Sequence, residues 1–276
     1  MARNLPLSLF LKSLLVGTPA ERVAKQVRWL FTAKSRFLHP ELWEVYLEEQ
    51  RLPLILQRLL TNESCGVDVG SHIGSFLGLL MRYAPNGHHV AFEASPIKCE
   101  WLRRRFSDVE IFHYAVAGEA GSAVFEEDVV RPGYSHLKAG RSESGAKSIL
   151  YEVQTCRLDD VLLKKDRIDL IKFDIEGGEL AALRGAVELV EKCRPAIIFE
   201  CGSEYFFSQQ KSTRRDLYDF ITDKLNYEIF SFADFLFDKG EMTFGEFRKC
   251  GLYPFRAFNF VALPQSGDSH GKLQTA

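Results

Sequence analysis

Residues 65–74, with the sequence CGVDVGSHIG, constrain the fold of this chain more than any other segment. A short apolar run that contains one acid, Asp68, is followed by two glycines four residues apart, Gly70 and Gly74, and then by the apolar segment 75–81. This order predicts a strand, a tight turn and a helix. Gly70 would let the backbone approach a ligand closely, and Gly74 would let the new helix pack tightly on its strand. The segment is therefore typical of a nucleotide-binding site.

The same succession of apolar run and helical segment continues toward the C-terminus. The runs that we expect to form strands are 65–69, 88–93, 109–116, 123–125, 168–174, 195–200, 227–230 and 258–263. Strands that alternate with helices indicate an α/β fold with a mainly parallel sheet. Turn residues but no helix precede the last run, so we expect that strand to enter antiparallel, at an edge of the sheet.

Three of the expected strands end in an acid, at Glu93, Asp174 and Glu200. Ligands of parallel α/β sheets bind at the carboxyl ends of the strands, so these side chains should surround one crevice. Asp68 is a further acid, inside an otherwise apolar strand. A carboxylate is costly to bury unless something donates hydrogen bonds to it. Asp68 therefore either contacts a ligand or accepts an internal hydrogen bond, such as a helix N-cap contact.

The composition narrows the class of protein. The chain has 276 residues, of which 46% are hydrophobic, and it can bury a large core in one domain. A net charge of −2 gives no sign of nucleic-acid binding. Six cysteines are scattered without a Cys-x-x-Cys pair or a nearby His at ligand spacing, which argues against a zinc site and favours a reducing compartment. No apolar run reaches the roughly 18 residues that span a bilayer. We expect a soluble, cytoplasmic protein.

The N-terminal region is expected to be helical. One helix is predicted over residues 18–31, and a second begins after Pro40 and breaks at Pro53. We expect a helical extension at 1–62, one domain at 63–264 and a disordered tail at 265–276. Basic residues outnumber the one acid, Glu21, in the first 36 positions: Arg3, Lys12, Arg22, Lys25, Arg28, Lys34 and Arg36. These residues could contact a membrane, but they are more often the solvated side of helices that cap a domain or pair two protomers.

The glycine spacing distinguishes between cofactors. A nicotinamide site prefers Gly-x-Gly-x-x-Gly, whereas this chain has Gly70-x-x-x-Gly74 with Asp68 two residues earlier. That departure favours S-adenosylmethionine. Glu93, at the end of the second strand, is placed to bind both ribose hydroxyls, although an acid at this position serves either cofactor.

Four segments together resemble the FkbM-type methyltransferases. They are VDVGSHIG at 67–74, AFEASP at 91–96, LDDV at 158–161 and, most specifically, IKFDIEGGE at 171–179. The resemblance covers roughly residues 65–263, and Ser71, His72 and Ala94 depart from the residues usual in the family. It implies a class I methyltransferase fold, with a seven-stranded sheet whose last strand is antiparallel. It also implies S-adenosylmethionine-dependent O-methylation, with hydroxyls of sugars or secondary metabolites as acceptors.

Two groups of site residues follow. For the proton of the acceptor hydroxyl, Asp174 is the first choice as general base, and Glu176 or Glu200 would share that role or bind acceptor hydroxyls. His136 is a weaker candidate. The residues expected to hold the cofactor lie in the first turn, at the end of the second strand and in the third strand: Asp68, Gly70, Ser71, His72, Gly74, Glu93, Ala94, Ser95, Ala115 and Val116.

Each of these assignments has a structural alternative. Asp174 could accept hydrogen bonds from backbone amides, and Glu176 and Glu179 open a helix, where acids are favoured by the helix dipole. Asp159 and its neighbour Asp160 are expected to cap a short helix, although such a pair could hold a divalent cation; we expect no metal.

The sequence thus predicts an O-methyltransferase that acts on a sugar, a glycan or a secondary metabolite. A non-catalytic nucleotide-binding regulator or scaffold with the same fold is the alternative, and a nicotinamide-dependent oxidoreductase fits the glycine spacing less well. Homodimer formation is left open. Aromatic residues of the C-terminal third could line an acceptor pocket, although most are expected in the core: Tyr205, Phe206, Phe207, Phe230, Phe232, Phe235, Phe237, Phe244, Phe247, Tyr253 and Phe255.

Overall fold

The computed structural model describes residues 14–16, 18–128, 136–137, 148–202, 207 and 212–265. The helices are α2 (Pro19–Phe31), α3 (Ala33–Leu38), the 3-10 helix η1 (Pro40–Leu42), α4 (Trp43–Leu59), α5 (Ser75–Tyr83), α6 (Pro96–Arg105), α7 (Leu158–Leu162), α8 (Glu179–Arg184), α9 (Val187–Cys193), α11 (Arg214–Asp219), the π-helix η3 (Phe220–Lys224), α12 (Phe232–Leu236) and α13 (Phe244–Cys250). The strands are β1 (Gly66–Val69), β2 (Val90–Phe92), β3 (Glu110–Phe112), β4 (Ala115–Val116), β5 (Gly121–Asp128), β6 (His136–Leu137), β7 (Ser148–Cys156), β8 (Leu170–Phe173), β9 (Ala196–Glu200), β10 (Tyr227–Ser231) and β11 (Asn259–Pro264). The predicted tail falls outside the described residues from 266 onward.

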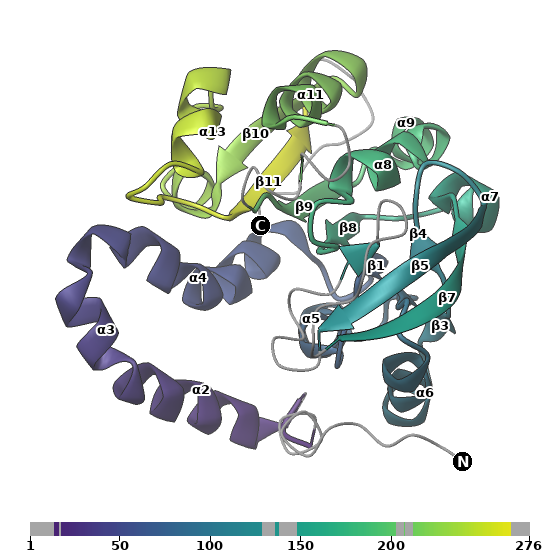
Figure 1. Cartoon of the computed structure of the whole chain (residues 1–276), viewed down its shortest axis with the longest axis horizontal. Coiled ribbons are helices and arrows are strands. Elements are labelled where there is room, and N and C mark those ends of the chain that lie inside the picture. Colours follow the sequence, from purple (N-terminus) through teal and green to yellow (C-terminus); the bar gives the residue numbers. More distant parts are fainter. Residues whose placement is uncertain are drawn as a thin grey trace.

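The centre of the molecule is a seven-stranded sheet in the order β10-β11-β9-β8-β1-β2-β3 (Figure 1). Its strand pairs are parallel except for those of β11, which runs antiparallel to both neighbours. The α/β class and the antiparallel last strand are therefore confirmed. The predicted place of that strand at an edge is wrong, because β11 lies between β9 and β10. The position suits its apolar residues Phe260, Val261 and Ala262, which are fully buried, as side chains on both faces of an inner strand are.

Two layers of helices cover the two faces of the sheet, and successive residues of one strand serve opposite layers. On β8, Ile171 belongs to the apolar cluster that includes α8, α9 and α11, whereas Leu170 belongs to the cluster that includes α4, α5 and α6. Because both faces are buried, the inner strands read in the sequence as continuous apolar runs. The strands other than β11 run in one direction, so their carboxyl ends lie at the same edge of the sheet.

A second sheet, in the order β4-β7-β5-β6, lies beside the first. The run expected as one strand over 109–116 is divided, since β3 pairs with β2 and β4 pairs with β7. The run expected at 123–125 is the centre of β5, which pairs antiparallel with β7 from Gly121 to Asp128. Most of the loop between them lies outside the described residues, and so does the side chain of His136.

The helices before residue 60 form an arm, which we define as residues 18–60 (Figure 1). The predicted break at Pro53 is wrong, because α4 continues through it. The turns beyond the proline bury Ile55 and Leu56 completely against the sheet. Full burial of two such side chains contributes about 3–6 kcal/mol, which offsets the roughly 3 kcal/mol that an internal proline costs.

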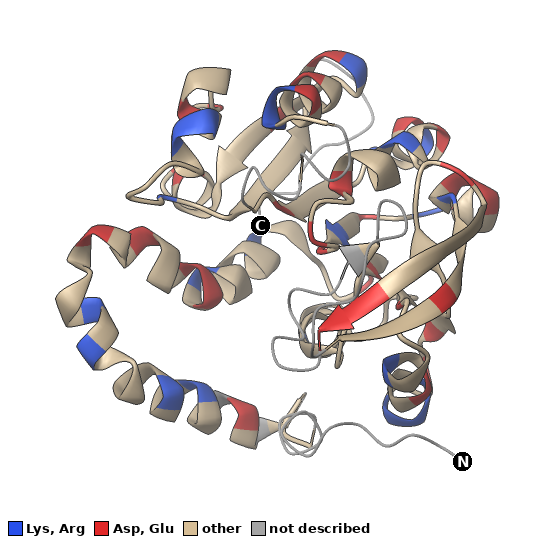
Figure 2. Ribbon diagram, viewed as in Figure 1, with Lys and Arg blue, Asp and Glu red and all other residues tan. Residues whose placement is uncertain are grey.

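The outer part of the arm leaves an apolar stripe in solvent. Its side chains recur at helical spacing and are 44–85% exposed: Val23, Val27, Leu30, Phe31, Phe37 and Leu38. The opposite face is charged and makes ion pairs with Glu49 of α4 through Lys25 and Arg28 (Figure 2). Within the described residues, no helix is long and apolar enough to cross a membrane. Membrane contact and pairing of two protomers through the arm both stay predictions.

Candidate functional site

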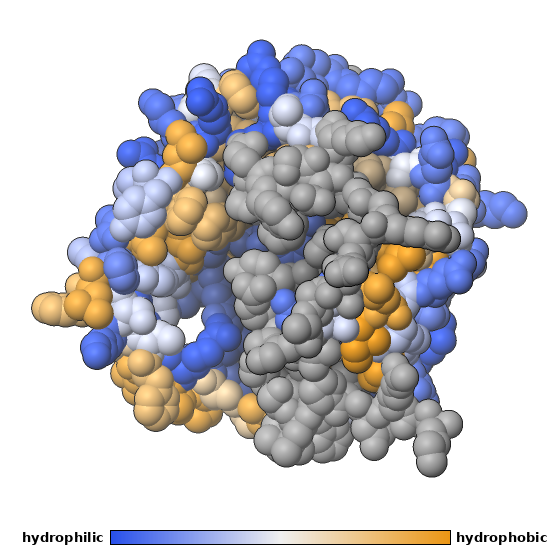
Figure 3. Space-filling model, viewed as in Figure 1, coloured by the Kyte–Doolittle hydropathy of each residue, from blue (hydrophilic) through white to orange (hydrophobic). Residues whose placement is uncertain are grey.

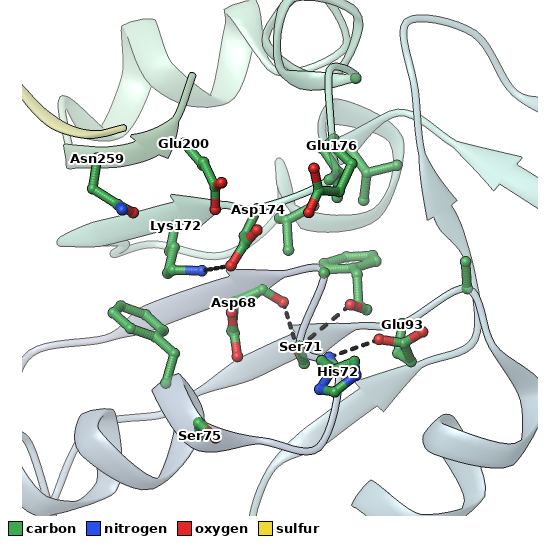
Figure 4. Close-up of a pocket in the computed structure, with 18 of the residues that line it drawn as sticks. Asp68, Ser71, His72, Ser75, Glu93, Lys172, Asp174, Glu176, Glu200 and Asn259 are labelled. Carbon is green, nitrogen blue, oxygen red and sulfur yellow. Dashed lines mark hydrogen bonds and ion pairs between the residues drawn. The ribbon is translucent and has the colours of Figure 1, made fainter. Parts of the chain in front are cut away.

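A cavity of about 590 Å³ opens at the carboxyl ends of β1, β2, β8 and β9 (Figure 4). The expectation that acids at the strand ends surround one crevice is confirmed, because Glu93, Asp174 and Glu200 all line it. Most of the predicted site residues line this cavity: Asp68, Gly70, Ser71, His72, Glu93, Ala94, Ala115, Val116, Asp174, Glu176 and Glu200.

Gly74 and Ser95 are the predicted residues that lie outside the cavity lining. Gly74 precedes α5 with a φ of 86°, and a Cβ there would overlap with the ring of Phe106, the residue that follows α6. Ser95 caps α6, and its side chain accepts a hydrogen bond from the amide of Lys98. Both residues position the walls of the site without facing its interior.

The turn after β1 brings backbone directly to the cavity. Gly70 has a φ of 85°, a conformation that favours glycine, and any Cβ at this position would overlap with the carbonyl oxygen of Asp174. His72 is also left-handed, with a φ of 52°. The hydroxyl of Ser71 closes the turn by donating to the carbonyl oxygen of Asp68 at 2.8 Å. The turn is therefore fixed by close packing and leaves little room for larger residues.

Glu93 is held between two backbone amides at the end of β2. One oxygen accepts a hydrogen bond from the amide of His72 at 2.7 Å, and the other accepts one from the amide of Ser95 at 2.8 Å. Burial raises its pKa, while the ammonium of Lys98 opposes that shift. Lys98 is itself buried in an ion pair with Glu127, at 3.0 Å. Each Glu93 oxygen has a second lone pair, so the carboxylate can still accept hydrogen bonds from a ligand.

Asp68 is fully buried at the floor of the cavity. Neither of its carboxylate oxygens accepts a hydrogen bond from the part of the chain that the structure describes. Burial raises the pKa of this group to about 6. A buried carboxylate without donors is unfavourable in the unliganded protein, so its position points to a ligand that donates hydrogen bonds.

Lys172 and two acids form the other side of the cavity (Figure 4). The Nζ atom of Lys172 lies 2.5 Å from an oxygen of Asp174. Burial alone would raise the pKa of Asp174, but the Lys172 ammonium holds it below its ordinary value. Burial, together with the charge of Asp174, raises the pKa of Glu200 well above its usual range. The Lys172 ammonium therefore favours the ionised form of Asp174, whereas burial beside Asp174 favours the protonated form of Glu200.

Glu176 occupies the turn between β8 and α8. The turn is left-handed at Glu176 and Gly177, with φ values of 50° and 93°. It is held by Glu179, whose buried carboxylate accepts hydrogen bonds from the amides of Ile175 and Gly177 at 3.3 and 3.2 Å. Burial and, second, the charge of Asp174 raise the pKa of Glu176 to about 8. Glu179 thus positions the turn that directs Glu176 toward the cavity.

Comparison with known proteins identifies the family. The family model described as "Methyltransferase FkbM domain" matches residues 68–237, which carry both the first turn and the acids of β8 and β9. The chain belongs to the FkbM methyltransferase family. The resemblance on which the sequence analysis relied is therefore confirmed, as is the class I methyltransferase fold.

The individual relatives that this chain matches have low sequence identity to it. A curated protein, methyltransferase sdnD from Sordaria araneosa, is 28% identical over 155 residues, which are 44% of this chain and 60% of that protein. A solved FkbM methyltransferase from Methylobacillus flagellatus is 18% identical, with a TM-score of 0.47, over 74% of this chain and 44% of that one. An O-methyltransferase from Bacillus cereus, solved in complex with SAH, is 13% identical, with a TM-score of 0.42, over 79% and 81% of the two chains. This chain thus spans less than two thirds of the first two relatives.

Other polar residues of the chain make structural contacts. The ring of His89 joins the amide of Gly66 to the carbonyl oxygen of Ala84. His113 pairs with the carbonyl oxygen of Ala94 at 3.0 Å. Asp159 accepts hydrogen bonds from Arg157 and from the amide of Leu189. Among the described residues there is no group of three or more side chains that could hold a metal ion.

Several residues of the site were not predicted from the sequence. Lys172 could have been, because it precedes Asp174 by two positions on a strand and therefore points to the same face. Glu48 and Asn259 also line the cavity and hydrogen-bond to each other at 2.9 Å. Because 211 positions separate them in the sequence, no local pattern indicates this contact.

Proposed function

We propose that this FkbM methyltransferase transfers a methyl group from S-adenosylmethionine to a hydroxyl of a sugar, a glycan or a secondary metabolite, and that it acts in the cytoplasm. One observation carries the proposal. The buried Asp68 carboxylate, which has no hydrogen-bond donor in the described chain, lines the same cavity as Glu93. Two acids placed in this way suit a ligand that carries both a cationic group and a pair of hydroxyls.

S-adenosylmethionine has these groups. Its ammonium would give Asp68 the donor that the carboxylate lacks, and its ribose hydroxyls would donate to Glu93. Gly70 lines the cavity with its backbone, and Ala115 and Val116 of β4 supply an apolar wall. When bound, the cofactor supplies a methyl group on a sulfonium, a carbon that is already activated for displacement.

The three acids on the acceptor side would then divide the proton chemistry. Asp174, kept ionised by Lys172, is suited to accept a hydrogen bond from the acceptor hydroxyl and so to orient it. Glu176, whose pKa is raised to about 8, is a stronger base and is suited to take the hydroxyl proton as the new bond forms. We therefore assign the general base to Glu176, where the sequence favoured Asp174. Glu200, whose protonated form is favoured by burial beside Asp174, would in that form donate a hydrogen bond to Asp174 and hold it in place.

Methyl transfer can be tested with S-adenosylmethionine that is labelled on the methyl group. A panel of octyl glycosides, long-chain diols and hydroxylated aromatic compounds provides the acceptors. The proposal predicts a labelled product that survives alkali, because a methyl ether is stable there. Label released as methanol would indicate a methyl ester and would contradict O-methylation of a hydroxyl. Cofactor binding with no transfer to any member of the panel would favour the non-catalytic alternative.

A further inference from the structure

One wall of the cavity is apolar and is built from three separate helices. Leu52 of α4, Phe76 and Leu79 of α5, and Phe232 of α12 line the cavity and pack in the same apolar cluster. These side chains present only carbon and hydrogen to the interior. A ligand covered with hydroxyls would lose hydrogen bonds to water on this wall without gaining others in exchange.

The apolar wall adjoins the acids of the acceptor side. The Nζ atom of Lys172 lies 5.4 Å from the centre of the Phe76 ring, and the same atom is paired with Asp174. Figure 4 shows Lys172 beside Asp174, with Glu200 and Asn259 on the same side of the cavity. The part of the wall at Phe76 therefore adjoins Lys172 and, through its ion pair, Asp174.

The arm is a fixed part of this wall. Glu48, one turn before Leu52 on α4, is buried and accepts hydrogen bonds from the amides of Phe258 and Asn259 at 2.8 and 3.1 Å. It also accepts one from the side chain of Asn259. These contacts tie α4 to the start of β11, next to Glu200 on β9. Figure 3 shows apolar surface on the arm and an opening between the arm and the rest of the molecule.

From this arrangement we propose that the acceptor carries an apolar group next to the hydroxyl that is methylated, and that α4, α5 and α12 bind this group. The inference rests on the proposed function for the identity of the reaction, but the binding wall can be tested without it. Leu52 lies before residue 68, where the family match begins. Selection of the acceptor would therefore depend partly on a helix outside the matched domain.

The probes are n-octyl β-D-glucoside, below its micelle concentration, and methyl β-D-glucoside, which has the same sugar hydroxyls without the chain. Calorimetry is done on the full chain, with and without S-adenosylhomocysteine. We expect the octyl compound to bind at least about tenfold more tightly, as burial of several methylene groups implies. Leu52→Asp should weaken binding of the octyl compound by about tenfold or more, because its alkyl chain would then contact a charged group. Leu52→Ala should weaken this binding less.

Leu54→Asp is the matched control. Leu54 lies on the same helix and is 51% exposed. The same charge at this position should therefore leave the affinities for both glucosides and for S-adenosylhomocysteine unchanged. The thermal unfolding temperature of each variant shows whether it folds. If Leu52→Asp does not fold, Leu52→Ala takes its place in the test. S-adenosylhomocysteine affinity should stay unchanged in both Leu52 variants.

Equal affinity for the two glucosides, or no binding of the octyl compound, would overturn the proposal. An equal loss of affinity for the octyl compound in Leu52→Asp and Leu54→Asp would also overturn it, because such a result would mean that the detergent binds non-specifically. Failure of the proposed function gives a different result. In that case S-adenosylhomocysteine does not bind, while the octyl preference and its dependence on Leu52 remain measurable.

Discussion

The two ends of the cavity are assembled in different ways. Near β1 and β2, the ligand-facing groups come from one tight turn, around Gly70, and from two acids at strand positions, Asp68 and Glu93. Near β9 and α4, they are side chains such as Leu52 and Asn259, from elements far apart in the sequence. The first end is determined by local backbone geometry and the second by tertiary packing. The cofactor end should therefore be sensitive to small changes of backbone, and the acceptor end to changes of single side chains.

The largest effect is expected from Glu176→Gln, which keeps the size of the side chain but removes the base. Turnover should fall by about 10²–10⁴-fold, while S-adenosylhomocysteine affinity stays unchanged. In the parent protein kcat/KM should rise with pH toward about 8, as Glu176 loses its proton, and then level off. The variant should lack this rise. Glu188→Gln, at an exposed acid of α9, is the control. Retained turnover in Glu176→Gln would move the general base to Asp174, whose low pKa gives no rise of kcat/KM toward pH 8.

Gly70→Ala tests whether the backbone geometry of the turn determines binding at the cofactor end. The left-handed conformation costs a non-glycine residue about 1–3 kcal/mol, and the new Cβ must also displace the carbonyl of Asp174. We expect affinity for S-adenosylhomocysteine to fall by about 100-fold, measured by calorimetry. Gly240→Ala is the control, since a Cβ there meets nothing within 4 Å. Unchanged affinity in Gly70→Ala would mean that the turn can shift without loss of the site.

Asp68→Asn separates stability from binding. In the unfolded chain this carboxyl loses its proton near pH 3.8, whereas in the folded protein it does so near pH 6. The folded state thus binds more protons between these values, and its stability falls as the pH rises through that window, by up to about 3 kcal/mol. Asparagine does not ionise, so the variant should be more stable than the parent at pH 8 and equally stable near pH 4. Denaturant unfolding at the two pH values tests this.

The same substitution should weaken cofactor binding, because the ligand's ammonium loses its anionic partner. We expect a loss of about tenfold or more in calorimetry. A variant that is less stable at pH 8 would show that Asp68 makes favourable contacts in the unliganded protein. A variant that binds as tightly as the parent would remove Asp68 from the cofactor site.

The difference between the two ends also explains what the sequence could predict. The strand, turn and helix around Gly70 follow from consecutive residues, and acids at strand ends follow from the direction of a parallel sheet. The position of β11 does not, because an antiparallel strand can be added at an edge or between two others with the same local pattern. The contact of Glu48 with Asn259 depends on how α4 packs against the sheet, which is a matter of tertiary structure. The predicted break at Pro53 rested on the general rule that proline interrupts a helix. The burial of the last turns of α4 outweighs that preference.

The central claim is that the turn at Gly70 and the acids beside it bind S-adenosylmethionine. Its most direct test is calorimetric titration of the parent and of Glu93→Ala with S-adenosylmethionine and S-adenosylhomocysteine, with NAD as the competing cofactor. The control is Glu110→Ala, at an exposed acid on the next strand. We predict micromolar binding of the first two ligands alone, a loss of about 100-fold in Glu93→Ala from two missing charge-assisted hydrogen bonds, and no change in the control. Binding of NAD instead, or equal affinity in Glu93→Ala and the parent, would contradict the account.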